Sequence, residues 1–240
     1  MQYFKTPSNN LKESQAVDED YKDSEYTRGH LAPSSHQGTE EDRKATFTLT
    51  NIVPQMEGSN GITWKDLEEE VMERLYDCEG LMYVITGVMP YKTESEFKKH
   101  WLKDKDGKDR VAIPEYMWSA YCCPNHTPNT QFFPTYAAVG RNDPDSNNDI
   151  VTKDPNVPEN RRGYDVRQMD LKSLEGILSK RFNTEINLFE GKSQICSLFQ
   201  STISGYTRDH LNPGMHQETK EDREATFTLS NITPQWKRLQ

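Results

Sequence analysis

Two stretches of this chain carry the same polar residues at the same spacing. In the first stretch Arg28 and His30 stand two positions apart, and Asn51 follows His30 after 21 residues as the start of an Asn-x-x-Pro-Gln segment. A histidine exchanges protons near neutral pH, and arginine and asparagine supply fixed hydrogen-bond donors. The set therefore indicates chemistry rather than packing.

The two stretches are copies of one unit. Tyr26–Gln55 and Tyr206–Gln235 are identical at 21 of 30 positions with a constant offset of 180 and no gap. Shared periodicity does not produce so long an ungapped match, so the segment was duplicated. The second copy repeats the polar set at three positions, which are Arg208, His210 and Asn231.

Only the first copy continues into residues that can complete a site. Asn60 and Glu68 follow Asn51 by nine and seventeen positions, whereas the sequence given ends nine positions after Asn231. We therefore expect the second copy to be an inactive fragment. The expected organisation is a domain over residues 1–198 followed by a partial repeat over residues 199–240.

The apolar pattern predicts the elements that position these residues. Alternation over Phe47–Ile52 predicts a strand that ends near Asn51, and helical spacing of apolar residues predicts a helix over Ile62–Asp77. The apolar run Leu81–Val88 predicts a central strand buried on both faces. Residues 1–25 show no periodicity and predict an extended segment.

The rest of the chain mixes strands and helices without strict alternation. The expected features are a hairpin turn at residues 105–108, a strand over Val111–Tyr121 that contains Pro114 and so lies at an edge or carries a bulge, a strand over Phe132–Val139, a helix around Leu171–Leu178 and a last strand over Ile186–Phe189. This order predicts an α+β fold around a mixed or antiparallel central sheet.

Composition limits the kinds of partner. The formal net charge of −9 argues against a chain that coats nucleic acid, although contact with a substrate stays possible. No apolar run reaches the roughly 18 residues of a membrane span, and the polar N-terminus is unlike a secretory leader. We therefore expect no membrane partner and no signal peptide in the chain as given.

The four cysteines are too few and too irregularly spaced for a zinc site. They are Cys78, the adjacent pair Cys122 and Cys123, and Cys196. Disulfides are possible, and Cys78 and Cys196 could each pair with either of the adjacent cysteines.

The polar pattern resembles a known family. Thr27-Arg28-Gly29-His30, the Asn51 segment, Asn60 and Glu68 are similar to the DNA/RNA non-specific endonucleases of the ββα-metal (His-Me finger) superfamily. Within this superfamily, the sequence segments ATFTLTNIVPQ and YCCPN look most like those of the endonuclease domain-containing 1 proteins of vertebrates. The resemblance implies a ββα-metal active-site motif and cleavage of DNA, RNA or both.

The resemblance also implies a role for each residue. His30 would be the general base, Asn60 the protein ligand to one Mg²⁺ ion, which Mn²⁺ can replace, and Glu68 a second contact to that ion through water. Arg28 would bind the phosphate of the substrate, and Asn51 would support the loops of the site.

The chain departs from the family pattern at named positions. The family motif begins with Asp where this chain has Thr27, and the second copy has Asp209 where Gly29 stands in the first. Family members also carry strands before the motif, and we expect these strands to be missing from the chain as given. An alternative function is therefore an inactive, nuclease-like binding module. Relatives of this kind suggest a secreted protein, and the sequence indicates neither its compartment nor its oligomeric state.

Overall fold

The computed structural model describes residues 15–76, 78–125, 135–147, 150–189 and, for the backbone alone, 231–236. In chain order its elements are α2 (Asp18–Tyr21), β1 (Tyr26–His30), η1 (Ser34–His36), α3 (Glu40–Ala45), η2 (Leu49–Asn51), β2 (Ile52–Met56), η3 (Ser59–Thr63), α4 (Trp64–Leu75), β3 (Leu81–Met89), α5 (Glu94–Phe97), β4 (Trp101–Lys103), β5 (Asp109–Ala112), β6 (Tyr116–Cys122), β7 (Thr135–Arg141), η4 (Glu159–Arg161), β8 (Val166–Met169), α6 (Leu171–Phe182) and β9 (Asn231–Trp236). No helix in these ranges is long and apolar enough to cross a membrane.

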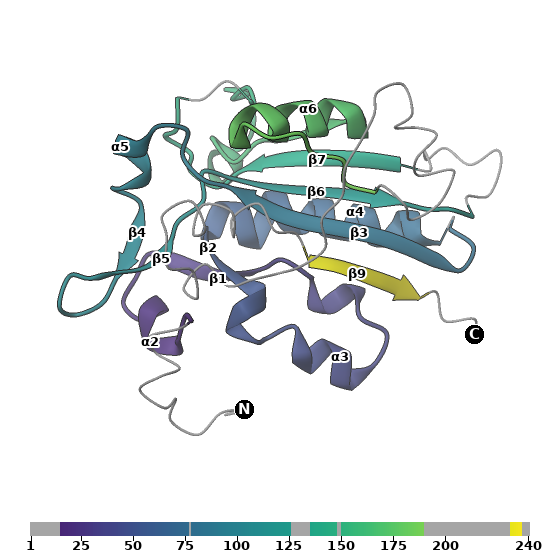
Figure 1. The fold of residues 1–240 in the computed structure, drawn as a ribbon, viewed down its shortest axis with the longest axis horizontal. Helices are drawn as coiled ribbons and strands as arrows, with labels where there is room; N and C mark the ends of the chain where they lie inside the picture. Colours follow the sequence, from purple (N-terminus) through teal and green to yellow (C-terminus); the bar gives the residue numbers. More distant parts are fainter. Residues whose placement is uncertain (1–14, 77, 126–134, 148–149, 190–230, 237–240) are drawn as a thin grey trace.

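A five-stranded antiparallel sheet with the order β8-β7-β6-β3-β9 forms the centre of the molecule (Figure 1). Helix α6 packs on one face, where its leucines meet β3, β6 and β7 in the largest core cluster. Helix α4 packs on the other face, against side chains of the same strands. Two separate hairpins, β1 with β2 and β4 with β5, complete an α+β fold, as the sequence predicts.

The expected central elements are confirmed. The apolar run predicted over Leu81–Val88 is β3, whose residues from Val84 to Met89 are all buried. The helix predicted over Ile62–Asp77 is α4, and the helix predicted around Leu171–Leu178 is α6. Both helices present a continuous apolar stripe to the sheet, which is the signal that the sequence carries.

Turn and edge predictions hold in part. A turn separates β4 from β5 where the sequence predicts one, and Gly107 adopts a φ of 78° there. The edge or bulged strand expected over Val111–Tyr121 is instead split into β5 and β6 around Pro114, which has no backbone N–H to continue a strand. Strand β6 lies inside the central sheet between β7 and β3. Strand β7 begins at Thr135, and the first part of the strand expected from Phe132 lies outside the described residues.

The strand expected over Phe47–Ile52 is wrong. Only its last residue enters β2, because the chain turns through η2 just before it. The backbone N–H of Asn51 donates to the Thr48 carbonyl at 2.8 Å, and the Asn51 side chain donates to the Thr46 carbonyl at 2.8 Å. These local hydrogen bonds replace the ladder that a strand would need.

The strand expected over Ile186–Phe189 is also wrong, because side chains of α6 take its backbone donors. The Ile186 N–H donates to Ser179 Oγ at 3.0 Å, and the Leu188 N–H donates to Glu175 Oε1 at 2.8 Å. Phe189 is fully buried in the core without belonging to a strand. The apolar pattern of this segment therefore reflects burial in the core and not pairing within a sheet.

The N-terminal segment is not wholly extended. Residues 18–21 form the short helix α2, where the Val17 N–H donates to Asp20 Oδ2 at 2.8 Å. Asp20 also pairs with Arg110 of β5 at 2.8 Å, and both side chains are buried. This ion pair ties the segment before β1 to the β4–β5 hairpin. Residues 1–14 lie outside the described part of the chain.

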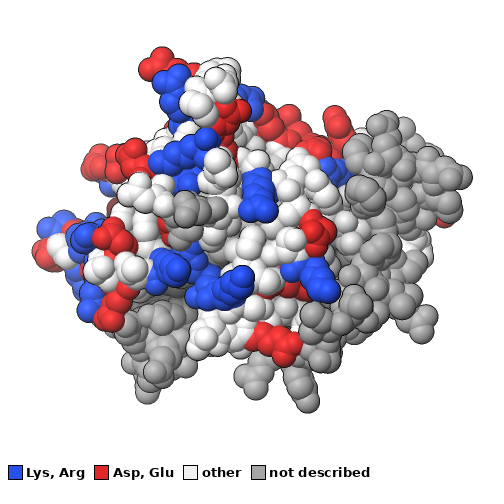
Figure 2. All heavy atoms as spheres, turned by 90° about the horizontal axis from the view of Figure 1, so that it is seen from above, with Lys and Arg blue, Asp and Glu red and all other residues white. Residues whose placement is uncertain are grey.

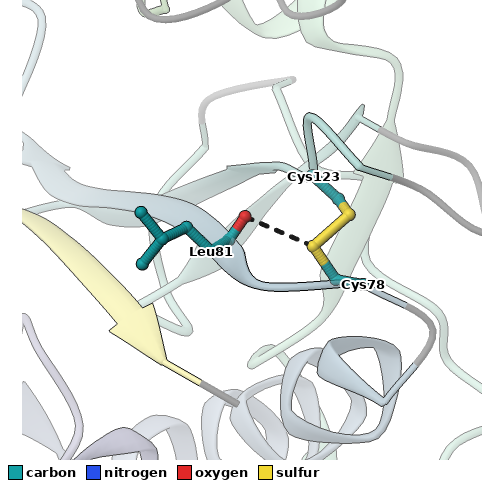
Figure 3. The surroundings of a disulfide bond; sticks show 3 residues. All are labelled: Cys78, Leu81 and Cys123. Carbon is teal, nitrogen blue, oxygen red and sulfur yellow. Dashed lines mark hydrogen bonds between the residues drawn. A yellow bond between two sulfur atoms is a disulfide. The ribbon is translucent and has the colours of Figure 1, made fainter.

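A disulfide joins Cys78 to Cys123 across the ends of β3 and β6 (Figure 3). Cys78 Sγ lies 3.4 Å from the carbonyl oxygen of Leu81, which is a close contact because a disulfide sulfur has no proton to donate. The structure thus selects one of the pairings that the sequence left open. Cys122 is disulfide-bonded as well.

The repeat reaches the sheet through β9. In the first copy Asn51 precedes β2, which pairs with β1, whereas Asn231 begins β9, which pairs along β3 with Thr86 opposite Asn231. The corresponding segments of the two copies therefore pair with different strands. Arg208 and His210 lie outside the described residues.

Candidate active site

The candidate site is built on a β–β–α unit. Strands β1 and β2 form an antiparallel hairpin in which Thr27 faces Gln55 and His30 faces Ile52. The chain then turns through η3, a π-helical turn, into α4. Val53 of the hairpin packs with Trp64 and Leu67 of α4, so the hairpin lies against the helix that follows it.

Gly29 allows the hairpin and the turn to lie this close together. A Cβ atom at position 29 would stand 2.1 Å from Gln55 Oε1. The Gln55 side chain has no exposed surface, and its Nε2 donates to Ser59 Oγ at 2.8 Å. Only glycine fits beside a side chain that is fixed in this way.

Asn60 lies in η3 and is tied to β1. Its Nδ2 donates to Thr27 Oγ1 at 2.8 Å, and Thr27 Oγ1 donates to the Gln55 carbonyl at 2.7 Å. Asn60 Oδ1 has no hydrogen bond to any described residue. Mg²⁺ prefers oxygen ligands and keeps most of its waters, so an amide oxygen of this kind fits the ion.

His30 ends β1 with one ring nitrogen inside the protein. Its Nε2 is buried and has no hydrogen-bond partner among the described residues. The ring meets Phe47 edge to face, with centroids 4.8 Å apart. Burial lowers the pKa of the imidazole below its usual 6.5, so the ring is neutral at pH 7 and able to accept a proton.

Asn51 fixes the chain that follows His30. Its side chain accepts from the Ala32 N–H at 3.0 Å and donates to the carbonyls of Ala32 and Thr46. Its backbone carbonyl accepts from the Leu31 N–H at 2.9 Å. The buried amide therefore joins the residues after His30 to the start of β2.

Arg28 shares one face of β1 with His30, because the two residues are two positions apart in a strand. Its side chain is about half exposed and pairs with Asp18 of α2 at 2.9 Å. The guanidinium also lies over the Tyr21 ring at 5.8 Å. A phosphate would have to compete with the Asp18 carboxylate for this arginine.

Glu68 faces a small cavity between α4 and the sheet. Polar and apolar side chains line it, namely Pro33, His36, Trp64, Leu67, Glu68, Val71, Val84, Thr86 and Ser119. Burial, and then the nearby charge of Glu69, raise the pKa of the Glu68 carboxyl to about 8. The carboxyl is therefore mostly protonated at pH 7.

His36 is a member of this cavity that the sequence analysis did not single out. Its Nε2 lies 2.8 Å from the backbone carbonyl of Glu68, while Nδ1 is buried without a partner among the described residues. Burial lowers the pKa of its imidazole, so the ring is neutral and donates from Nε2. It recurs as His216 in the second copy, but duplication of the segment explains that recurrence without a function.

The structure brings some of the expected residues together and leaves others apart. Asn60 meets β1 through Thr27, and Asn51 holds the segment after His30. Within the described ranges no direct hydrogen bond joins His30, Asn60 and Glu68 to one another. Those ranges also contain no group of three or more histidine, cysteine or acidic residues that could hold a metal.

Basic and acidic side chains are interspersed on the face shown in Figure 2. Among the basic side chains of the chain, Lys98 pairs with Glu94, and Lys99 pairs with Glu96. Their positive charge is thus offset locally.

Comparison with known proteins gives a consistent result. A sequence model described as DNA/RNA non-specific endonuclease matches residues 3–177. The human Endonuclease domain-containing 1 protein is 34% identical over 121 residues, which are 49% of this chain and 21% of that protein. The mitochondrial Nuclease EXOG of Xenopus laevis is 28% identical over 200 residues, 81% of this chain and 51% of that protein. A protein of Nostoc sp. named Nuclease is 30% identical over 165 residues, 65% of this chain and 51% of that protein. The chain thus spans about half, or less, of the length of these relatives.

Proposed function

The chain belongs to the DNA/RNA non-specific endonuclease family, and from this premise we propose that it hydrolyses phosphodiester bonds of DNA, RNA or both with one Mg²⁺ ion bound. The observation that carries the proposal is the β–β–α unit, with His30 at the end of β1 and Asn60 in the turn tied to the same strand. Residues 1–198 would form the nuclease domain, and residues 199–240 a partial second copy.

His30 is the general base in this proposal. A neutral imidazole accepts a proton from the water that attacks phosphorus, and the buried environment keeps the ring neutral at pH 7. Asn51 positions the base, because its side chain fixes the backbone immediately after His30.

Asn60 would hold the ion through Oδ1, and Mn²⁺ can take the place of Mg²⁺. When bound, the ion neutralises charge on the phosphate and on the leaving oxygen. Glu68 would support it through water, which requires the carboxylate form. A nearby cation favours that form and so opposes the effect of burial on this carboxyl.

Arg28 would bind the substrate phosphate with its two terminal nitrogens. In this role Arg28 does not distinguish one nucleotide sequence from another, since a phosphate is present at every nucleotide. Backbone contact of this kind agrees with cleavage that has little sequence preference. In the second copy, which repeats Arg208, His210 and Asn231, the position that corresponds to Asn60 is Gln240, and we propose that this copy is inactive.

A second candidate is a catalytically inactive, nuclease-like module that binds a partner. The ion pair between Arg28 and Asp18 favours it, because this pair occupies the guanidinium that a phosphate would use. An exposed pair of this kind contributes only about 0–1 kcal/mol, so a phosphate can displace the carboxylate. We therefore place the hydrolase first.

The deciding experiment is digestion of plasmid DNA and of a structured RNA by the purified chain. We expect cutting with Mg²⁺, none with EDTA, and a rate about 10²- to 10⁴-fold lower for His30→Ala. His100→Ala is the control, since His100 stacks on Tyr91 in a different part of the fold. A folded chain that cuts neither substrate would leave the binding module as the better account.

A further inference from the structure

Thr27 stands where the family motif has an aspartate, and its hydroxyl joins two neighbours at once. Oγ1 lies 2.7 Å from the backbone carbonyl oxygen of Gln55, its partner in the hairpin register. The same oxygen lies 2.8 Å from the side-chain amide of Asn60. Both distances are those of full hydrogen bonds.

The single hydroxyl proton of Thr27 determines which group donates in each of these hydrogen bonds. A hydroxyl has one proton, and a backbone carbonyl can only accept, so the proton of Thr27 goes to Gln55. The contact with Asn60 must then be a donation from the amide NH₂ to Oγ1. The opposite amide orientation would place Oδ1 against an oxygen whose proton is already used.

The acceptor of the Thr27 proton is itself fixed. Gln55 is fully buried in β2, and its side chain is bonded to Ser59 and packed against Gly29. The Gln55 carbonyl cannot turn away without breaking the register of the hairpin. The direction of the whole chain of bonds, from Asn60 to Thr27 to Gln55, is therefore set by the backbone.

We propose that Thr27 is a positioning residue that fixes the amide orientation of Asn60 and so presents Asn60 Oδ1 to a divalent cation. This inference rests on the proposed function, in which Asn60 is the ligand. An aspartate at this position would also accept from the Asn60 amide, but it could not donate to the Gln55 carbonyl. Threonine satisfies both neighbours in this chain, and it does so without a charge.

The test is the affinity of the full chain for Mn²⁺, measured by isothermal titration calorimetry in the absence of nucleic acid. Thr27→Val keeps the shape of the side chain but removes the acceptor, and we expect the Kd to rise about 3- to 10-fold, the effect of one lost hydrogen bond. Thr27→Ser keeps the hydroxyl and should bind within about twofold of the wild type. Asn60→Ala should show no binding.

A second readout separates positioning from folding. In an amide-resolved NMR spectrum the two side-chain NH₂ protons of Asn60 should exchange more slowly with water in the wild type and in Thr27→Ser than in Thr27→Val, at a temperature where all three are folded. This comparison needs no metal, so it reports on the orientation of the amide alone.

The outcomes are distinguishable. If the wild type binds Mn²⁺, Asn60→Ala does not, and Thr27→Val binds as tightly as Thr27→Ser, then the inference fails while the proposed function stands. If the folded wild type binds no Mn²⁺, the proposed function fails and takes the inference with it. Weaker binding by Thr27→Val, with Thr27→Ser unchanged, supports both.

Discussion

At the scale of single residues, the buried imidazole of His30 determines how activity should depend on pH. Burial lowers its pKa below the usual 6.5, and only the neutral ring can accept a proton. The rate should therefore rise with pH through a midpoint below 6.5 and be level above it. The measurement is kcat/KM against pH with a short DNA substrate, since this ratio reports the free enzyme. A midpoint above 7 would contradict the assignment of His30.

Glu68 predicts a pH dependence of stability with the opposite sign. Its pKa is about 8 in the folded chain and about 4.5 in its ordinary state. Between these values the folded chain keeps a proton that the unfolded chain has lost, so stability falls as pH rises and levels off above 8. Glu68→Gln has no carboxyl to titrate. Between pH 4.5 and pH 8 we therefore expect the free energy of unfolding of the wild type to fall by about 4 kcal/mol more than that of Glu68→Gln.

Urea unfolding of both proteins at several values of pH measures this difference. Glu73→Gln is the control, because Glu73 is an exposed residue on the same helix and its removal should leave the pH slope as it is. Equal slopes for the wild type and Glu68→Gln would show that the Glu68 carboxyl is ionised in the folded chain at neutral pH.

At the scale of elements, the close contact between β1 and β2 predicts that Gly29 tolerates no side chain. A Cβ at this position would stand 2.1 Å from Gln55 Oε1, and Gln55 is held by its bond to Ser59. Gly29→Ala should lower the free energy of unfolding by about 1–3 kcal/mol, the usual result of overpacking. Activity should fall as well, since the shift would move both Thr27 and His30.

Gly38→Ala supplies the matched comparison. A Cβ there would meet no atom within 4 Å, so the free energy of unfolding should change by less than about 0.5 kcal/mol. Chemical denaturation of the two variants side by side gives the answer. A Gly29→Ala chain as stable as Gly38→Ala would mean that the Gln55 side chain can move aside.

The same scale shows what the sequence could predict and what it could not. The apolar patterns of β3, α4 and α6 identify these elements because each one packs a continuous apolar surface into the core. The segments Phe47–Ile52 and Ile186–Phe189 have strand-like patterns, but their N–H groups find partners outside a sheet. Local backbone carbonyls accept from the first segment, and side chains of α6 accept from the second. Propensity carries no information about such competition.

The contacts of the candidate site are harder to predict for a related reason. The spacing of His30, Asn51, Asn60 and Glu68 is visible in the sequence, and it carries the family resemblance. The bond between Asn60 and Thr27 is not visible, because it joins residues 33 positions apart through a hairpin whose register the sequence does not state. The pairing of His36 with the Glu68 carbonyl depends in the same way on how α4 lies against the loop after β1.

At the scale of the whole molecule, a disulfide fixes the chain just after the helix of the candidate site to the central sheet. The Cys78–Cys123 disulfide joins the chain between α4 and β3 to the residue after β6. Both cysteines are buried in the cluster that holds Val71 and Leu75 of α4. The bond thus restrains the end of the helix on which Glu68 stands.

The length of the closed loop predicts the contribution of this disulfide to stability. The two cysteines are 45 residues apart, and closing a loop of that length in the unfolded chain corresponds to about 4 kcal/mol. The double variant Cys78→Ala with Cys123→Ala should therefore lose about that free energy of unfolding in urea. Loss of the two buried sulfurs adds to the effect rather than offsetting it.

Reduction of the wild type with a thiol serves as the comparison, and because it also breaks the bond at Cys122 it should cost at least as much. A double variant within about 1 kcal/mol of the oxidised wild type would instead show that residual structure already restrains the unfolded chain without this bond.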